Sequence, residues 1–171
     1  MQKAIGIVMV ILAPSLMGFS RALRLRARAR FLADFISVLE IMRAEIGTRL
    51  TPLPELIDML SKSAPNSCRE FFTRLYKGME RLSEECFSRT WTDEVKILRK
   101  TVLTDEEFEI VNSLGAILGR YDSQEQKASI DAAIARLSVL ADEARIQSGA
   151  QGKLWTGLGV AMGIIITIVI V

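Results

Sequence analysis

The sequence predicts an all-α protein, an antiparallel six-helix cytoplasmic bundle flanked by an N-terminal and a C-terminal transmembrane helix. Two apolar segments without a charged residue, 4–20 and 154–171, lie at the ends of the chain. Between them, apolar residues recur with the period of an α-helix. No sustained two-residue alternation and no Asn-Gly or Asp-Gly hairpin signal occurs, so we expect no strand.

Each terminal segment is long enough to cross most of a bilayer. A helix of either segment would reach about 25 to 27 Å, against a hydrocarbon core roughly 30 Å thick. We therefore divide the chain into four parts. These are an N-terminal transmembrane helix (1–20), a basic juxtamembrane segment (21–30), a cytoplasmic helical bundle (31–152) and a C-terminal transmembrane helix (153–171).

Basic residues beside the terminal segments predict anchoring and orientation. They are Arg21, Arg24, Arg26, Arg28, Arg30 and Lys153. Positive charge beside a membrane helix favours the cytoplasmic side, so we expect the bundle in the cytoplasm. Because arginines end the first apolar segment where a cleaved signal peptide would carry small residues, we expect a retained anchor. The arginines point to several sides of a helix, which favours lipid headgroups over nucleic acid as their partner.

The composition argues against several classes of function. The chain has 22 Lys and Arg against 20 Asp and Glu, so no strong attraction to nucleic acid follows. It has no histidine, the commonest metal ligand and general base at neutral pH. Cys68 and Cys86 lack CxxC spacing, and we interpret them as small buried residues of a reducing compartment. No Walker loop, GxSxG or HExxH motif is present, so we expect no cofactor and no enzymatic activity.

The first two cytoplasmic helices follow from their apolar stripes and turn residues. The first is predicted to end at Gly47. Thr51 is expected to cap the second, with Pro52 in its first turn, before Ala64-Pro65-Asn66 ends it. The inward residues of the two helices are Phe31, Phe35, Val38, Leu39, Met42 and Ile46, then Leu53, Leu56, Ile57 and Leu60.

The other four helices are placed in the same way. The third begins near Ser67 and ends at Gly78, and the fourth begins near Ser83. Capping boxes at 104–107 and 123–126 open the fifth and sixth, so we interpret Glu106 and Glu107 as helix-start residues. A weak point is expected in the sixth helix at Gly149 and Gly152. The inward residues are Phe71, Phe72 and Leu75; Phe87, Trp91, Val95 and Leu98; Phe108, Val111, Leu114 and Leu118; and Ile130, Ile134, Leu137, Leu140 and Ala144.

Glycines and polar residues at two places suggest assembly surfaces. Gly159 and Gly163 form a GxxxG pattern, which allows transmembrane helices to pack closely. Gly115 lies inside the fifth helix, where glycine is unfavourable, and close approach of the sixth helix would explain it. The alternative is a partner-binding corner after the fifth helix, with the candidate residues Gly119, Tyr121, Asp122 and Gln126.

The order and spacing of these features resemble a known family. The chain has an apolar start closed by Gly18-Phe19, the basic segment, Leu39-Glu40 and Glu45-Ile46 ahead of Thr51-Pro52-Leu53-Pro54-Glu55, Trp91, Leu118-Gly119 with Asp122 and Gln126, and a glycine-spaced C-terminal helix. Over nearly its whole length it resembles the stage III sporulation protein AB family of endospore-forming bacteria. The family is similar to the cytoplasmic domain of the type II secretion inner-membrane platform protein.

The resemblance implies a non-enzymatic platform or scaffold of the mother cell–forespore transenvelope channel complex. The expected location is the mother-cell membrane around the forespore, with the bundle facing the cytoplasm. The expected partners are the membrane, a secretion-type ATPase of the same operon and other sporulation channel proteins; a homo-oligomer is left open. Two alternatives are a membrane-anchored helical regulator or enzyme that binds a small ligand between helices, and a pore-former.

Overall fold

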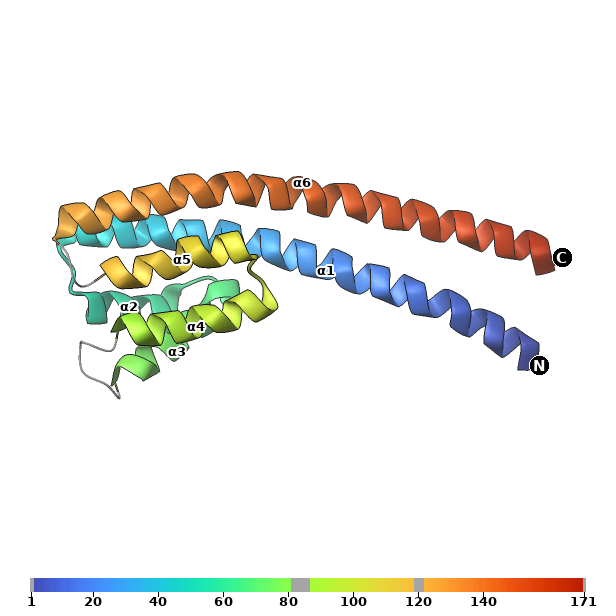
Figure 1. The fold of residues 1–171 in the computed structure, drawn as a ribbon, viewed down its shortest axis with the longest axis horizontal. Helices are drawn as coiled ribbons and strands as arrows, with labels where there is room; N and C mark the ends of the chain where they lie inside the picture. Colours follow the sequence, from blue (N-terminus) through green and yellow to red (C-terminus); the bar gives the residue numbers. More distant parts are fainter. Residues whose placement is uncertain (1, 81–86, 119–121, 171) are drawn as a thin grey trace. The chain divides into compact units, whose positions relative to one another are not determined.

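The computed structural model describes the backbone of residues 2–80, 87–118 and 122–170, and the side chains of residues 23–79, 87–118 and 122–149. Within these residues it contains six α-helices and no strand, which confirms the all-α class (Figure 1). The elements are α1 (Gln2–Ala44), the π-helix η1 (Glu45–Arg49), α2 (Leu53–Ser63), α3 (Asn66–Glu80), α4 (Phe87–Thr101), α5 (Asp105–Ile117) and α6 (Ser123–Ile170).

The chain divides into two compact units. One comprises Met1–Ala29 and Glu143–Val171, and the other comprises Arg30–Asp142. The terminal apolar segments belong to the first unit and are helical in backbone, but their side chains lie outside the described residues. Among the described residues, no helix has both the length and the apolar composition needed to cross a membrane.

The core of the Arg30–Asp142 unit is built around aromatic rings. Phe35 of α1 stacks on Phe31 at 5.5 Å and on Phe72 of α3 at 6.3 Å between ring centroids. Phe71 meets Phe72 edge-on at 5.0 Å and Trp91 of α4 at 5.2 Å. Aromatic pairs at such distances add attraction beyond the burial of their area. The rings therefore connect α1, α3 and α4 through one continuous cluster.

Trp91 also joins α4 to α5. Its side chain is fully buried, and its indole Nε1 donates a hydrogen bond of 2.9 Å to the Val111 carbonyl oxygen. Helices α2 with α3, α3 with α4, and α4 with α5 pack against each other. The predicted inward residues are buried in all six helices, except that Leu53, Ile134 and Leu140 are half-buried.

Polar contacts connect helices at the edge of this core. Ser67 of α3 donates a hydrogen bond of 2.5 Å to Asp34 of α1. An ion pair of 2.8 Å joins Arg43 of α1 to Asp131 of α6, and the hydrogen bond to Asp131 raises the pKa of Arg43. Both partners of this pair are about two-fifths exposed, so its contribution to stability is small. The two contacts join α1 to α3 and to α6 at the edge of the core.

Two glycines predicted to end helices, Gly47 and Gly78, lie inside helical structure, in η1 and in α3. Gly149 and Gly152, where a weak point of the sixth helix was predicted, lie within the single helix α6. A Cβ added at Gly78 would collide with the Thr90 side chain of α4. Because α4 approaches so closely, no side chain larger than that of glycine fits at position 78. This close approach explains Gly78 better than helix termination does.

Gly115 is also explained by the close approach of another helix, but this helix is not the sixth helix that the sequence predicted. A Cβ built there would lie 2.5 Å from Cγ of Trp91 and 2.9 Å from its Cβ. The helix that approaches closely is therefore α4, and the expectation of α6 was wrong.

Candidate functional site

The end of α1 forms an unusual turn. The π-helix η1 follows Ala44, and Leu50 then takes the left-handed conformation, with φ 54° and ψ 35°. The Glu45 carboxylate accepts hydrogen bonds of 2.8 Å from Arg49 Nη1 and 2.8 Å from Thr51 Oγ1. Thus Thr51 secures the turn and does not cap the next helix as predicted. The N-cap of α2 is Pro52, without a side-chain hydrogen bond.

Leu50 stores backbone strain in this turn. Side chains with a Cβ disfavour the left-handed region, and single residues there often occur at functional sites. Leu50 is 68% exposed, so the strain is not offset by burial of its side chain. A π-helical turn is a second feature that is frequent at functional sites. The turn at 45–51 is therefore a candidate for function on backbone geometry alone.

Replacing Leu50 by asparagine tests the strain. Asparagine tolerates the left-handed conformation, so we expect L50N to raise the free energy of unfolding by about 1 kcal/mol. Urea denaturation followed by circular dichroism measures the change. V139N, at a 61% exposed position in α6, is the control and is expected to destabilise slightly. An unchanged or lower stability of L50N would contradict strain at this residue.

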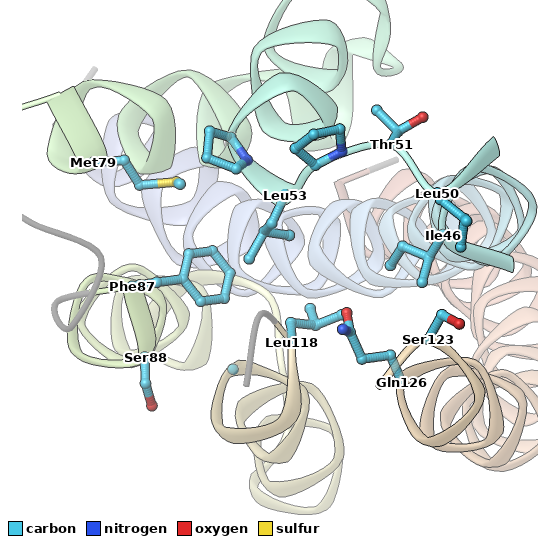
Figure 2. Close-up of a pocket in the computed structure, with 13 residues that line it drawn as sticks. Ile46, Leu50, Thr51, Leu53, Met79, Phe87, Ser88, Leu118, Ser123 and Gln126 are labelled. Carbon is cyan, nitrogen blue, oxygen red and sulfur yellow. The ribbon is translucent and has the colours of Figure 1, made fainter. Parts of the chain in front are cut away.

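A cavity of about 350 Å³ lies beside this turn (Figure 2). Its wall includes Ile46 and residues 50–54 on one side, Met79 and Phe87 on another, and Gly115 and Leu118 of the α5 region. Ser123 and Gln126 of the first turn of α6 complete it. In Figure 2, Leu53, Phe87 and Leu118 point toward one another across the space, and the Gln126 carboxamide lies beside Leu118.

The predicted partner-binding corner contributes to this cavity in part. Gln126 lines it, whereas Gly119 and Tyr121 lie outside the described residues. The Asp122 carboxylate accepts hydrogen bonds from the backbone N–H groups of Gln124 at 2.8 Å and Glu125 at 2.9 Å. Asp122 therefore caps α6, a role that the sequence prediction gave to Ser123. Gln126 of this corner and the Thr51-Pro52-Leu53-Pro54 segment line the same cavity, which their separation in sequence did not reveal.

The other predicted site residues are placed as follows. Arg24, Arg26 and Arg30 are exposed on α1, and Arg28 is half-buried. The side chains of Arg21 and Lys153 lie outside the described residues, as do the surroundings of Gly159 and Gly163 in α6. The anchoring and packing roles of these residues remain predictions.

Acidic residues at the start of α5 serve the helix. Thr104 donates its backbone N–H to Glu107 Oε2 at 2.7 Å, and Thr104 Oγ1 accepts from the Glu107 N–H at 3.5 Å. This confirms the capping box predicted there. The buried carboxylate of Glu107 is thus part of the helix terminus. No group of three or more metal-ligating side chains occurs in the part of the chain that the structure describes.

Cys68 has the burial of a structural residue. Its side chain is fully buried, and this burial raises the pKa of the thiol from an ordinary value of 9.0 to about 11, against a lowering effect of the Ser67 hydroxyl. A thiol that stays protonated is a poor nucleophile. The interpretation of Cys68 as a small core residue is confirmed, and Cys86 lies outside the described residues.

The raised pKa of Cys68 predicts a loss of stability at alkaline pH. Between pH 8 and pH 10 the thiol ionises in the unfolded chain and stays protonated in the folded one, so protons are bound more strongly by the folded state. The free energy of unfolding should fall by roughly 1 kcal/mol over this range because of Cys68. Urea titrations of the wild type and of C68A at both pH values measure the difference. Equal pH dependence in the two proteins would contradict the assignment.

Together the fold and the site define a helical-bundle protein with a strained turn and a mainly apolar cavity at one end of the bundle. The chain belongs to the stage III sporulation protein AB family, whose model matches residues 3–171. It is 23% identical over 171 residues to stage III sporulation protein AB of Bacillus subtilis (strain 168), and the alignment covers 99% of each chain. No solved structure matches. The family gives the protein a role in sporulation.

Proposed function

We propose that this chain is a non-enzymatic membrane platform of the secretion-like channel complex between mother cell and forespore, required for endospore formation. Its bundle is presented to a secretion-type ATPase of the same operon and contacts other channel proteins. Membership of the sporulation family supports this proposal. The platform role itself extends the likeness to type II secretion platform proteins that the sequence resemblance implies.

One observation carries the proposal: the first and last helices of the bundle also contain the terminal apolar segments. Helix α1 is Gln2–Ala44 and helix α6 is Ser123–Ile170, each assigned as one helix. Within the Arg30–Asp142 unit, the Arg43–Asp131 ion pair joins the two helices. A domain held by two helices resists swivelling, so force applied to it by an ATPase can reach both terminal segments.

The proposed location is the mother-cell membrane around the forespore, with both terminal segments crossing it and the bundle in the cytoplasm. The uncharged sequences 4–20 and 154–171 support this location. The exposed side chains of Arg24, Arg26 and Arg30 are suited to contact anionic headgroups. Gly159 and Gly163 would allow the C-terminal helix to pack closely against a neighbour, including a second copy of this chain.

The non-enzymatic assignment is supported by the roles of the polar groups. Asp122 and Glu107 cap helices, and Cys68 is buried with a raised pKa. Perturbed titratable groups at catalytic sites usually lie in clefts near a charged partner. The carboxylates of Asp122 and Glu107 instead satisfy helix ends, and the Cys68 thiol fills the core.

Binding to the ATPase tests the platform role. Full-length protein in lipid nanodiscs is expected to bind the purified ATPase with a dissociation constant on the order of tens of micromolar or lower. Photo-crosslinking residues placed singly at the exposed positions Leu50, Ile97 and Val139 should locate the ATPase in sporulating cells. Crosslinks at some of these positions and not at others would indicate that the ATPase binds one specific face of the bundle. Absence of binding in this range, together with absence of crosslinks, would refute the ATPase partnership.

Protease protection tests the orientation separately. Protease added outside intact mother cells should leave the Arg30–Asp142 unit intact, and permeabilised cells should lose it. Digestion in intact cells would place the bundle on the other side of the membrane. Release of the full-length chain without detergent would refute membrane anchoring.

A further inference from the structure

Leu50 lies at the mouth of the cavity beside the η1 turn and is largely exposed. It lines the cavity of about 350 Å³ and yet keeps 68% of its surface in contact with solvent. In Figure 2 its side chain lies next to Ile46 at the edge of the space, and Leu53, Phe87 and Leu118 point toward one another across it. Burial of a leucine side chain is favourable. A large apolar side chain is therefore left exposed beside an apolar space.

The backbone also disfavours this position of Leu50. With φ 54° and ψ 35° the residue is left-handed, and its Cβ is crowded by the neighbouring carbonyl oxygen. Interiors contain few voids larger than a water molecule, which occupies roughly 30 Å³. The cavity is large enough to receive the isobutyl group of a leucine. Strain, exposure and the open space all favour movement of Leu50 into the cavity.

Hydrogen bonds to Glu45 oppose this movement. The Glu45 carboxylate accepts bonds of 2.8 Å from Arg49 Nη1 and 2.8 Å from Thr51 Oγ1. The Glu45 carbonyl oxygen accepts the backbone N–H of Leu50, and that of Thr51 at 3.2 Å. The Arg49 side chain is 73% exposed, so water competes for its bond and the net gain is small. Small gains balance small costs, which places two conformations of the turn close in free energy.

The sequence makes Leu50 the pivot of such a change. Pro52 and Pro54 have fixed φ angles, which limits movement of the segment that enters α2. The residue before a proline is restricted as well, so Thr51 has little freedom. Rotation about the backbone dihedrals of Leu50 can therefore turn its side chain without unwinding the next helix.

We propose that Leu50 is a plug on a two-state turn. In the open state, which the structure describes, Glu45 holds Leu50 left-handed and exposed. In the closed state Leu50 leaves the left-handed region, loses its bonds to Glu45 and packs in the cavity against Leu53 and Phe87. A partner that packs on Leu50 selects the open state, so the turn controls whether this side chain is presented at the surface.

Methyl relaxation-dispersion NMR of the full-length protein in detergent micelles tests the exchange. The method detects a minor state that interconverts with the major one in microseconds to milliseconds. With isoleucine and leucine methyl groups labelled, Ile46, Leu50 and Leu53 should show exchange. The methyl groups of Leu75 and Leu137, which are buried elsewhere in the bundle, should not.

Two variants change the balance in opposite directions. T51V removes the hydroxyl that donates to Glu45 and keeps the shape of the side chain, so it should raise the closed population about threefold to tenfold. T101V is the matched control, because the Thr101 hydroxyl bonds to the Ile97 carbonyl of its own helix, and it should behave like the wild type. L50N tolerates the left-handed region and has no apolar group to bury, so it should abolish exchange at the cavity methyl groups.

A further variant locates the plug. E45A removes both carboxylate bonds, so nuclear Overhauser effects between the Leu50 methyl groups and the Phe87 ring should appear in it. The same effects, measured in T51V, provide the evidence if E45A does not fold. Flat dispersion at Leu50 in both wild type and T51V would overturn the proposal. Equal exchange in wild type and T51V, exchange that persists at Leu53 in L50N, or no contact between Leu50 and Phe87 in the folded variants would also overturn it.

Discussion

W91A should lose about 3 to 5 kcal/mol of the free energy of unfolding. Trp91 is fully buried, and its ring meets Phe71 at 5.2 Å and Phe87 at 5.7 Å. Truncation leaves a large void between α3, α4 and α5, and it also removes the indole hydrogen bond to the Val111 carbonyl. Because small domains have only about 5 to 15 kcal/mol of stability, this loss is a large fraction of the total. Urea denaturation monitored by far-UV circular dichroism measures it.

Two further variants separate the causes. W91F retains an aromatic ring and loses the indole donor, so we expect it to lose roughly 1 to 3 kcal/mol. I97A, at a 41% exposed position of the same helix, should lose less than about 1 kcal/mol. A W91A protein as stable as I97A would show that the aromatic cluster does not hold α3, α4 and α5 together.

G115A should lower the free energy of unfolding by about 1 to 3 kcal/mol, although alanine is the better helix former. The added methyl group would overlap the Trp91 side chain, and neither the indole nor the backbone of α5 can move far in a packed core. G149A is the matched control, because a Cβ at Gly149 meets no atom within 4 Å. This control should gain up to about 1 kcal/mol from helix propensity.

The double variant W91A/G115A tests whether Trp91 is the side chain that requires glycine at position 115. When the indole is absent, the added methyl group has space, and G115A should become neutral or stabilising in the W91A background. The interaction energy of the double-mutant cycle should then be about 1 to 3 kcal/mol. Additive effects of the two substitutions would mean that Gly115 is required for a reason other than contact with Trp91.

The helices could be predicted from sequence because each carries its own periodic signal. Phe31, Phe35 and Met42 in α1, and Trp91 and Val95 in α4, repeat at helical spacing and are buried as expected. The capping box of α5 was also predictable, since a capping box is a contact between residues three apart. Local patterns of this kind need no knowledge of the rest of the chain.

Helix ends were predicted less well. Gly47 and Gly78 satisfy the usual rule for a helix terminus, yet the helical backbone continues through both. The true left-handed residue is Leu50, which no propensity favours, and the true cap of α6 is Asp122. Glycine can mark either a helix end or a place where another helix approaches, and sequence alone does not distinguish these two causes.

The candidate site shows the same difference between what local sequence patterns predict and what helix packing decides. The sequence identified Gln126 and the Thr51-Pro52-Leu53-Pro54 segment separately, but it gave no sign that they share a cavity. More than seventy residues separate them, so their proximity depends on how α2, α4, α5 and α6 pack. The cavity itself is an absence of atoms, which has no signature in composition or periodicity.

By itself, the sequence determined the all-α class, the inward face of each helix and the uncharged terminal segments, because these depend on periodicity and composition within one stretch of chain. Tertiary structure alone decided that Gly115 adjoins Trp91, that Glu45 secures the turn after α1, and that a cavity lies beside this turn. The physical reason is that packing between helices depends on the shapes of side chains distant in sequence, which local patterns do not encode.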